Sequence, residues 1–73
     1  MPIKLSDHAI QQLKRRELSE HLVIKVAGEP EEILSSYRGR KLRRKRIGDK
    51  ILEVVTRTEG SRITIITAYF LEE

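Results

Sequence analysis

The residues best suited to chemistry in this chain are cations, and most of them lie in one short stretch. Between positions 38 and 46, seven of nine residues are Arg or Lys, and no acid interrupts them. Residues 1–37 carry five Lys/Arg and six Asp/Glu, whereas residues 38–73 carry ten and five, so the net charge changes from −1 to +5. Such an asymmetric charge attracts polyanions, of which nucleic-acid backbones are the commonest in a cell. The alternative is a solvated edge strand on which cations prevent aggregation.

His8 is the most informative single residue. It falls in the first turn of a predicted helix, where free backbone amides and the positive end of the helix dipole favour a bound phosphate. The same field disfavours the imidazolium form and keeps a neutral ring available as a base. The alternative is a surface histidine whose ring packs over the helix end.

Three further residues carry groups that could act on a ligand. Arg16 lies at the rim of an apolar helical stripe, so its guanidinium needs an acid, a backbone carbonyl or a ligand phosphate as acceptor. Thr67 and Tyr69 end an apolar alternation with hydroxyl groups, and Tyr69 could stack a base or donate a proton. A structural ion pair for Arg16 and a rim position for Tyr69 are the alternatives.

The sequence contains no paired carboxylates, Ser/His/Asp set, glycine-rich phosphate loop or metal-ligand cluster. Two histidines without any cysteine argue against structural zinc, and we expect no cofactor. The remaining inventory of cations, histidine and tyrosine suits phosphodiester cleavage by the 2′-OH of RNA. In that reaction the protein aligns the attack, moves protons and neutralises charge on the phosphorane.

Two short helices are predicted to hold the N-terminal candidates. Ser6 and Asp7 start the first, with Ala9, Ile10 and Leu13 as its apolar stripe. Ser19 is the N-cap of the second, which Gly28 and Pro30 close.

Three strands are predicted to follow, at residues 40–47, 50–58 and 62–70, after a possible turn at 31–34. Gly48 and Asp49 form a two-residue hairpin turn with glycine first, which suits type II′. We predict residues 40–47 as an edge strand and the last strand as a central one. The fold class is therefore α+β, with two N-terminal helices packed on a twisted antiparallel sheet of three to four strands.

The alternation within residues 40–47 separates the cations into two sets. Arg44 and Arg46 share one face with Leu42, whereas Lys41, Arg43 and Lys45 share the other. Ile47 belongs with the second set, and this inconsistency predicts a bulge. Which face lines a cleft stays open. The predicted nucleic-acid contacts are Arg40, Arg43, Arg44, Lys45, Arg46, Arg57 and Thr67, and the predicted catalytic residues are His8, Arg16 and Tyr69.

Size and composition indicate one small domain, residues 1–73, with a thin core that leaves room for stabilisation by a second copy. The N-terminus lacks the apolar segment of a signal peptide, and no apolar run reaches membrane-spanning length. We expect a cytoplasmic protein without a membrane partner.

Four motifs together resemble a known family. They are Ser-Asp-His-Ala at 6–9, Arg-Arg-Glu-Leu-Ser at 15–19, Glu-Pro-Glu-Glu at 29–32 and Ile-Ile-Thr-Ala-Tyr at 65–69. In order and spacing they are similar to a family of small bacterial and archaeal domains of unknown function, usually placed near the RelE/ParE and BrnT toxins. Glu17 stands where that family usually has glycine.

The resemblance implies a RelE-like fold and the toxin of a toxin–antitoxin pair, with ribonuclease activity on messenger RNA, ribosome-associated or free. It implies that His8, Arg16, Thr67 and Tyr69 are functional, and that a cognate antitoxin is a partner. Two other hypotheses stand beside this one. The chain could be a non-catalytic RNA- or DNA-binding module, for which about five neutralised phosphates give a salt slope near −4. It could also be a protein-binding partner that docks an acidic peptide on its basic strand.

Overall fold

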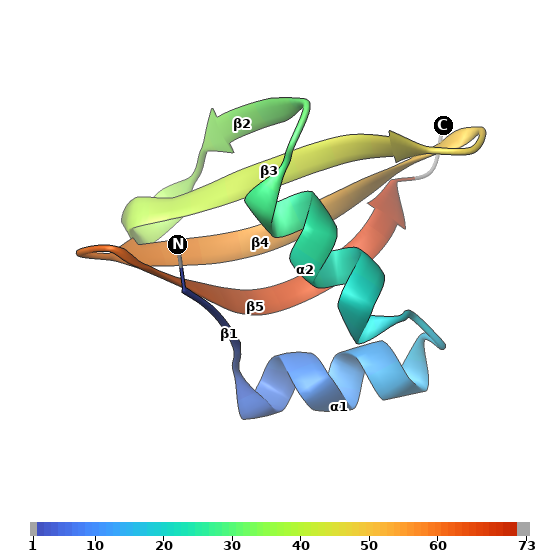
Figure 1. The fold of residues 1–73 in the computed structure, drawn as a ribbon, viewed down its shortest axis with the longest axis horizontal. Coiled ribbons are helices and arrows are strands. Elements are labelled where there is room, and N and C mark those ends of the chain that lie inside the picture. Colours follow the sequence, from blue (N-terminus) through green and yellow to red (C-terminus); the bar gives the residue numbers. More distant parts are fainter. Residues whose placement is uncertain (1, 72–73) are drawn as a thin grey trace.

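Five strands and two helices make up the computed structural model, which describes residues 2–71 (Figure 1). The last three strands follow one another without an intervening helix. The elements in chain order are β1 (Ile3–Leu5), α1 (Asp7–Arg15), α2 (Glu20–Gly28), β2 (Glu32–Ser35), a 3₁₀ turn (Tyr37–Gly39), β3 (Arg40–Ile47), β4 (Lys50–Glu59) and β5 (Arg62–Leu71).

Both helices begin at the predicted serine caps. The Ser6 hydroxyl accepts from the Ala9 amide at 3.0 Å, and the Ser19 hydroxyl accepts from the Leu22 amide at 3.3 Å. Each cap satisfies one of the amides that a helix start leaves free. Between the helices, Glu17 has φ +55°, a left-handed conformation that glycine adopts without steric cost. The departure from glycine at this position therefore leaves the turn intact but strained.

The predicted architecture is wrong, although the elements are α+β overall. The sheet is mixed and has five strands in the order β1-β5-β4-β3-β2, not an antiparallel sheet of three to four. β1 precedes the helices and pairs in parallel with β5, with Ile3 opposite Ile63 and Leu5 opposite Ile65. β1 and β2 are three and four residues long, too short for a recognisable alternation.

The edge assignment of β3 is also wrong, because β2 pairs antiparallel with it and forms the edge instead. β5 lies inside the sheet along the part of its length that β1 covers, as expected for a strand apolar on both sides.

The hairpin between β3 and β4 has the predicted two-residue turn, with Ile47 opposite Lys50 and Gly48 at φ +65°. The bulge predicted in β3 is absent, since the β3–β4 register runs without a shift over all described pairs. The irregularity lies instead between β4 and β5, where Val55 pairs with Thr67 but Thr56 pairs with Ile65. Ile66 is therefore the extra residue, and it lies on β5, which borders β4 along the edge that does not pair with β3.

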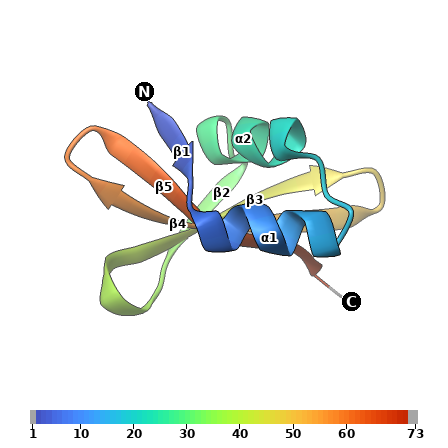
Figure 2. The ribbon, with the colours of Figure 1, turned by 90° about the horizontal axis from the view of Figure 1, so that it is seen from below.

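The core lies between the helices and one face of the sheet. Figure 2 shows α2 on one side of the sheet and α1 alongside it, whereas the turn between β2 and β3 extends away from α2. The fully buried core cluster consists of Ala9, Leu13, Val23, Val26, Ala27, Leu52, Val54, Ile65 and Ala68. Within residues 2–71, neither helix has the length and apolar character that crossing a membrane requires.

Candidate nucleic-acid interface

The strand alternation leaves one face of the sheet turned away from α2, here called the open face. On β3 the residues paired with the core positions Val54 and Leu52 face the helices, so their neighbours face the other way. The open face carries Arg40, Leu42, Arg44 and Arg46 from β3, Glu53, Val55 and Arg57 from β4, and Thr67 and Tyr69 from β5. The predicted cationic strand thus presents three of its arginines on one surface.

Arg43 and Lys45 lie on the opposite, helix-facing side. The Arg43 side chain donates from Nε to the Thr56 hydroxyl at 3.2 Å and from Nη1 to the Ala27 carbonyl at 3.0 Å. Ala27 is in the last turn of α2, where the carbonyls lack intrahelical partners and a cation is favourable. Arg43 therefore ties α2 to the sheet, and the structure does not bring it together with the other predicted nucleic-acid contacts.

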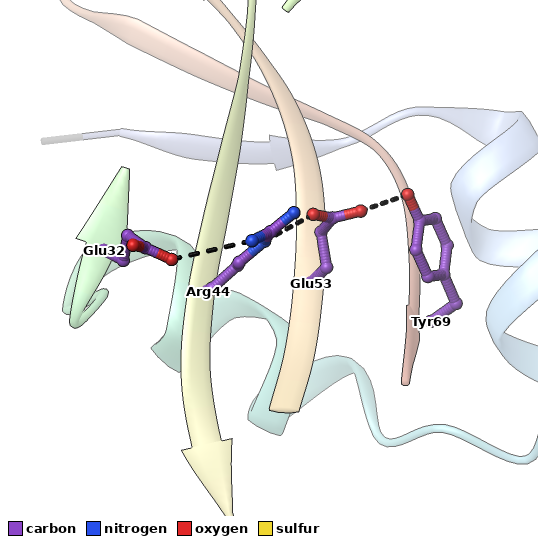
Figure 3. Close-up of polar contacts among 4 residues, drawn as sticks. All are labelled: Glu32, Arg44, Glu53 and Tyr69. Atoms are coloured by element: carbon purple, nitrogen blue, oxygen red, sulfur yellow. Dashed lines mark hydrogen bonds and ion pairs between the residues drawn. The ribbon is translucent and has the colours of Figure 1, made fainter. Parts of the chain in front are cut away.

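A continuous polar row crosses the open face near its middle (Figure 3). Arg44 Nε donates to Glu53 Oε1 at 2.6 Å, and Arg44 Nη1 lies 3.6 Å from Glu32 Oε1. The Tyr69 hydroxyl donates a hydrogen bond to the other carboxylate oxygen of Glu53. Glu53 is only 3% exposed, and its buried carboxylate is stabilised by these two hydrogen-bond donors.

Two members of this row, Tyr69 and Arg44, have raised pKa values. Burial raises the pKa of Tyr69 to about 12, and the hydrogen bond to Glu53 adds to the effect. The hydrogen bond to Glu53 likewise raises the pKa of Arg44 above its ordinary value. A tyrosine held in this state is a poor proton donor, and the charge of Arg44 is already opposed by two acids.

Arg16 and Thr67 meet Tyr69 at the C-terminal end of α1. Arg16 Nη1 donates to the Thr67 hydroxyl at 3.0 Å and to the Ala68 carbonyl at 3.1 Å, and its guanidinium lies 6.0 Å from the centre of the Tyr69 ring. The acceptor that Arg16 requires is thus a backbone carbonyl on β5. These contacts hold α1 against the part of β5 that β1 does not cover.

The three predicted catalytic residues do not converge. His8 lies in the first turn of the nine-residue helix α1, and Arg16 caps its other end. At 1.5 Å per residue the two Cα atoms are about 12 Å apart along the axis. Arg16 is bonded to Thr67 and Ala68, and neither Arg16 nor Tyr69 lines the hollow in which His8 lies.

His8 instead lies in a hollow at the other end of the open face, here called the His8 pocket. Its volume is about 310 Å³, and its lining residues are Ser6, His8, Arg40, Arg57, Glu59, Thr64 and Ile66. Arg40 and Arg57 are directly opposite each other on β3 and β4, and Thr64 is opposite Arg57 on β5. Three strands and the start of α1 therefore converge on this pocket.

The charges of the His8 pocket are unbalanced. Like charges directly opposite each other on neighbouring strands destabilise a sheet. Among the described residues, no ion pair within 4 Å joins Glu59 to either arginine, and the buried Nε of Arg40 has no hydrogen-bond partner. A bound anion would relieve the repulsion and satisfy this nitrogen.

The comparisons with known proteins give a family. The family described as "Domain of unknown function (DUF4258)" matches residues 5–70, nearly the whole chain. The chain is a DUF4258 protein. No curated protein and no solved structure matches it significantly. The predicted membership of a domain family of unknown function is confirmed, and the relation of that family to the RelE, ParE and BrnT toxins stays a prediction.

Sequence reasoning on the DUF4258 protein found part of this surface and missed the rest. His8, Arg40 and Arg57 do come together in the His8 pocket. Arg44 is paired with Glu53, and Arg46 lies toward the far end of β3. Arg43 and Lys45 are on the side of the sheet that faces α2. The missed residues are Glu53, whose signal was an acid set between apolar neighbours of a strand, and Ser6, Glu59 and Thr64, which only the strand register brings to His8.

A second hollow, of about 230 Å³, lies beside Arg44 and Arg46 of the DUF4258 protein. Two acids, Glu31 and Glu32, share its lining, and Glu31 accepts a hydrogen bond from the backbone amide of Arg46 at 2.6 Å. The Arg44 guanidinium in this hollow is already paired with Glu53 and Glu32, whereas Arg40 Nε in the His8 pocket has no partner, so the His8 pocket is the better candidate for an anion. Within residues 2–71 no cluster of three or more His, Cys, Asp or Glu side chains is arranged to hold a metal ion.

Proposed function

We propose that the DUF4258 protein binds an RNA strand with one backbone phosphate in the His8 pocket, and that it cleaves the RNA there as the metal-independent endoribonuclease toxin of a toxin–antitoxin pair. The observation that carries the proposal is the uncompensated Arg40–Arg57 pair, with its unpartnered Nε, beside a histidine at a helix start. Such a site is short of negative charge and of hydrogen-bond acceptors, and a phosphodiester supplies both.

Binding begins with the two arginines. Each guanidinium can direct two parallel N–H groups at phosphate oxygens, and the hydroxyl of Thr64 offers a further donor. The positive end of α1 adds to the field in the same place. Along β3 the distance from Arg40 to Arg46 is about 20 Å, so a strand lying on the open face would meet a second exposed cation several nucleotides away.

His8 and Glu59 supply the proton transfers in this proposal. The 2′-oxygen attacks phosphorus, giving up its proton to one of these side chains, and the new 2′-O–P bond forms as the P–O5′ bond breaks. The other side chain gives a proton to the departing 5′-oxygen, which leaves a 2′,3′-cyclic phosphate. Arg40 and Arg57 oppose the charge that accumulates on the phosphorane. Tyr69 and Arg16 have no part in this chemistry, because their contacts bind them to Glu53 and to β5.

The experiment is cleavage of single-stranded RNA in the presence of EDTA, with analysis of the fragment ends. We expect 2′,3′-cyclic phosphate ends, a loss of about 10²- to 10⁴-fold in rate for His8→Ala with binding retained, and no loss for Tyr69→Phe. Lys25→Ala, an exposed cation of α2, is the matched control. Cleavage that persists in EDTA but is indifferent to His8 and Glu59 would refute these roles.

Binding without cleavage is the second candidate, and one observation favours it. His8 and Glu59 are both exposed, whereas catalytic proton transfers are commonly carried out in sites that exclude water. The same assay separates the two candidates, because a binding module retains RNA in an Arg40- and Arg57-dependent manner and releases no fragments. On the toxin proposal the protein acts in the cytoplasm, and an acidic segment of its antitoxin would compete for the His8 pocket.

A further inference from the structure

The turn between β2 and β3 displays the most exposed aromatic ring among the described residues. Tyr37 is 86% exposed. It is one of only three aromatic residues in the chain, which has two tyrosines and one phenylalanine. The next residue, Arg38, has φ 57° and ψ 36°, and Gly39 has φ 73°. A left-handed non-glycine residue costs about 1 kcal/mol or more. The fold therefore holds Tyr37 outward on a turn that is strained.

This turn is fastened to the His8 pocket through Arg40. The Ser36 amide donates to the Arg40 carbonyl at 2.9 Å, and the Arg40 amide donates back to the Tyr37 carbonyl. Three residues of chain span at most about 11 Å, so the Cα of Tyr37 lies within one or two nucleotide lengths of the Cα of Arg40. The turn extends to the side of the sheet away from α2 (Figure 2), which is the side of the open face.

We propose that Tyr37 is a stacking platform for the nucleobase next to the phosphate held by Arg40 and Arg57, and that the nucleic acid is therefore bound as an unpaired strand. This inference rests on the proposed function. An exposed ring beside a phosphate site can stack an unpaired base of any identity, because every base has an aromatic face. Bases in a duplex are stacked on one another and do not offer that face.

No other aromatic residue of the described chain can take this role at the His8 pocket. The Tyr69 hydroxyl is bound to Glu53 and its ring lies beside Arg16, at the far end of α1 from His8. Phe70 packs against the core cluster on the helix side of the sheet. One platform gives recognition of an unpaired base without a sequence code.

The experiment measures binding of a short single-stranded oligonucleotide with 2′-deoxyribose throughout, so that cleavage cannot interfere. A second probe has the same backbone length but lacks its bases. We expect Tyr37→Ala to weaken binding of the first probe about 5- to 150-fold and to leave binding of the baseless probe unchanged. Tyr37→Phe should bind both probes like the wild type. Ile33→Ala removes another exposed apolar side chain, 51% exposed on the neighbouring strand, and should change neither.

Three results would overturn the inference. Equal binding of the first probe by wild type and Tyr37→Ala would show that no base stacks on the ring. Equal losses on both probes would assign Tyr37 to the backbone or to the shape of the turn. Retention of the first probe by Arg40→Ala/Arg57→Ala at wild-type strength would remove the phosphate site and the platform with it. If the double variant loses binding while Tyr37→Ala does not, the phosphate site stands and only the stacking role fails.

Discussion

Replacing Glu53 by glutamine tests whether the polar row on the open face stabilises the fold. The substitution keeps the size of the side chain and removes its charge. Arg44 Nε then loses a carboxylate at 2.6 Å, and the acid that remains is Glu32, which lies 3.6 Å from Arg44 Nη1 and has a side chain that is 57% exposed. A glutamine has one acceptor oxygen for the two donors of Arg44 and Tyr69, so one of them is left unsatisfied or faces the amide NH₂.

The expected cost follows from these contacts. Removing one partner of a fully buried ion pair costs about 3–5 kcal/mol. Glu53 is 3% exposed, but the Arg44 side chain is 28% exposed and recovers part of its hydration. We therefore expect Glu53→Gln to lower the free energy of unfolding by about 2–3 kcal/mol, which for a domain of this size lowers Tm by about 10–20 °C.

The assay is urea unfolding followed by circular dichroism, with Glu29→Gln, an exposed acid after α2, as the control. The triple variant Glu53→Leu/Arg44→Met/Tyr69→Phe replaces the pair by apolar side chains and removes the hydroxyl that Glu53 bonds, and it should recover most of the loss, since no unpaired charge or donor is left. A loss for Glu53→Gln below about 0.5 kcal/mol, the size of an ordinary surface substitution, would refute the reasoning.

Three further predictions concern residues outside the His8 pocket. In a Tyr37→Phe background Tyr69 is the one remaining tyrosine, and its tyrosinate absorbance should titrate with a midpoint near pH 12. Because the folded-state pKa of Tyr69 is above the unfolded value of about 10, its contribution to stability is complete below pH 10 and is lost between about pH 10 and 12. A midpoint near pH 10 would contradict the burial argument. Arg43→Ala should lower the free energy of unfolding by about 1–3 kcal/mol, because the hydrogen bonds to Thr56 and Ala27 are lost. The RNA affinity of the folded variant should equal that of the wild type, and a selective loss of affinity would place Arg43 in the interface. Glu17→Gly should raise the free energy of unfolding by up to about 1 kcal/mol, because φ +55° is unstrained for glycine. Urea unfolding measures the change, and a decrease would show that the turn depends on the glutamate side chain.

The sequence was sufficient for the elements whose signals are local. Serine caps at 6 and 19 and apolar stripes define both helices, and a Gly-Asp turn between alternating segments defines the β3–β4 hairpin. The two missed strands have no such local signal. β1 and β2 are stable only because β5 and β3 offer them a hydrogen-bonding edge, and that is a property of the assembled sheet.

The site was predictable in its chemistry but not in its grouping. The cations and His8 were evident in the sequence, yet their convergence depends on β1. The pairing of β1 with β5, continued by the hydrogen bond from the Ser6 amide to the Ile65 carbonyl, sets where α1 begins. The face of β3 that is exposed depends on where α2 packs: Arg43 lies opposite the core residue Val54, on the helix side, and there donates a hydrogen bond to the Ala27 carbonyl. Neither relation is visible in a local pattern.

The salt dependence of RNA binding tests most directly whether Arg40 and Arg57 form a phosphate site. Each phosphate neutralised on a single strand contributes about −0.7 to the slope of log K against log salt. On the open face, the one phosphate that Arg40 and Arg57 share and a second phosphate at Arg46 predict a slope of about −1.4. This slope is smaller in magnitude than the slope of about −4 expected from the whole basic stretch, because Arg44 is already paired and Arg43 faces α2. With the all-deoxyribose probe, Arg40→Ala/Arg57→Ala removes the shared phosphate contact and should reduce the magnitude of this slope by about 0.7, and Lys25→Ala should leave it unchanged. Parallel lines for the wild type and the double variant would contradict the proposed phosphate site.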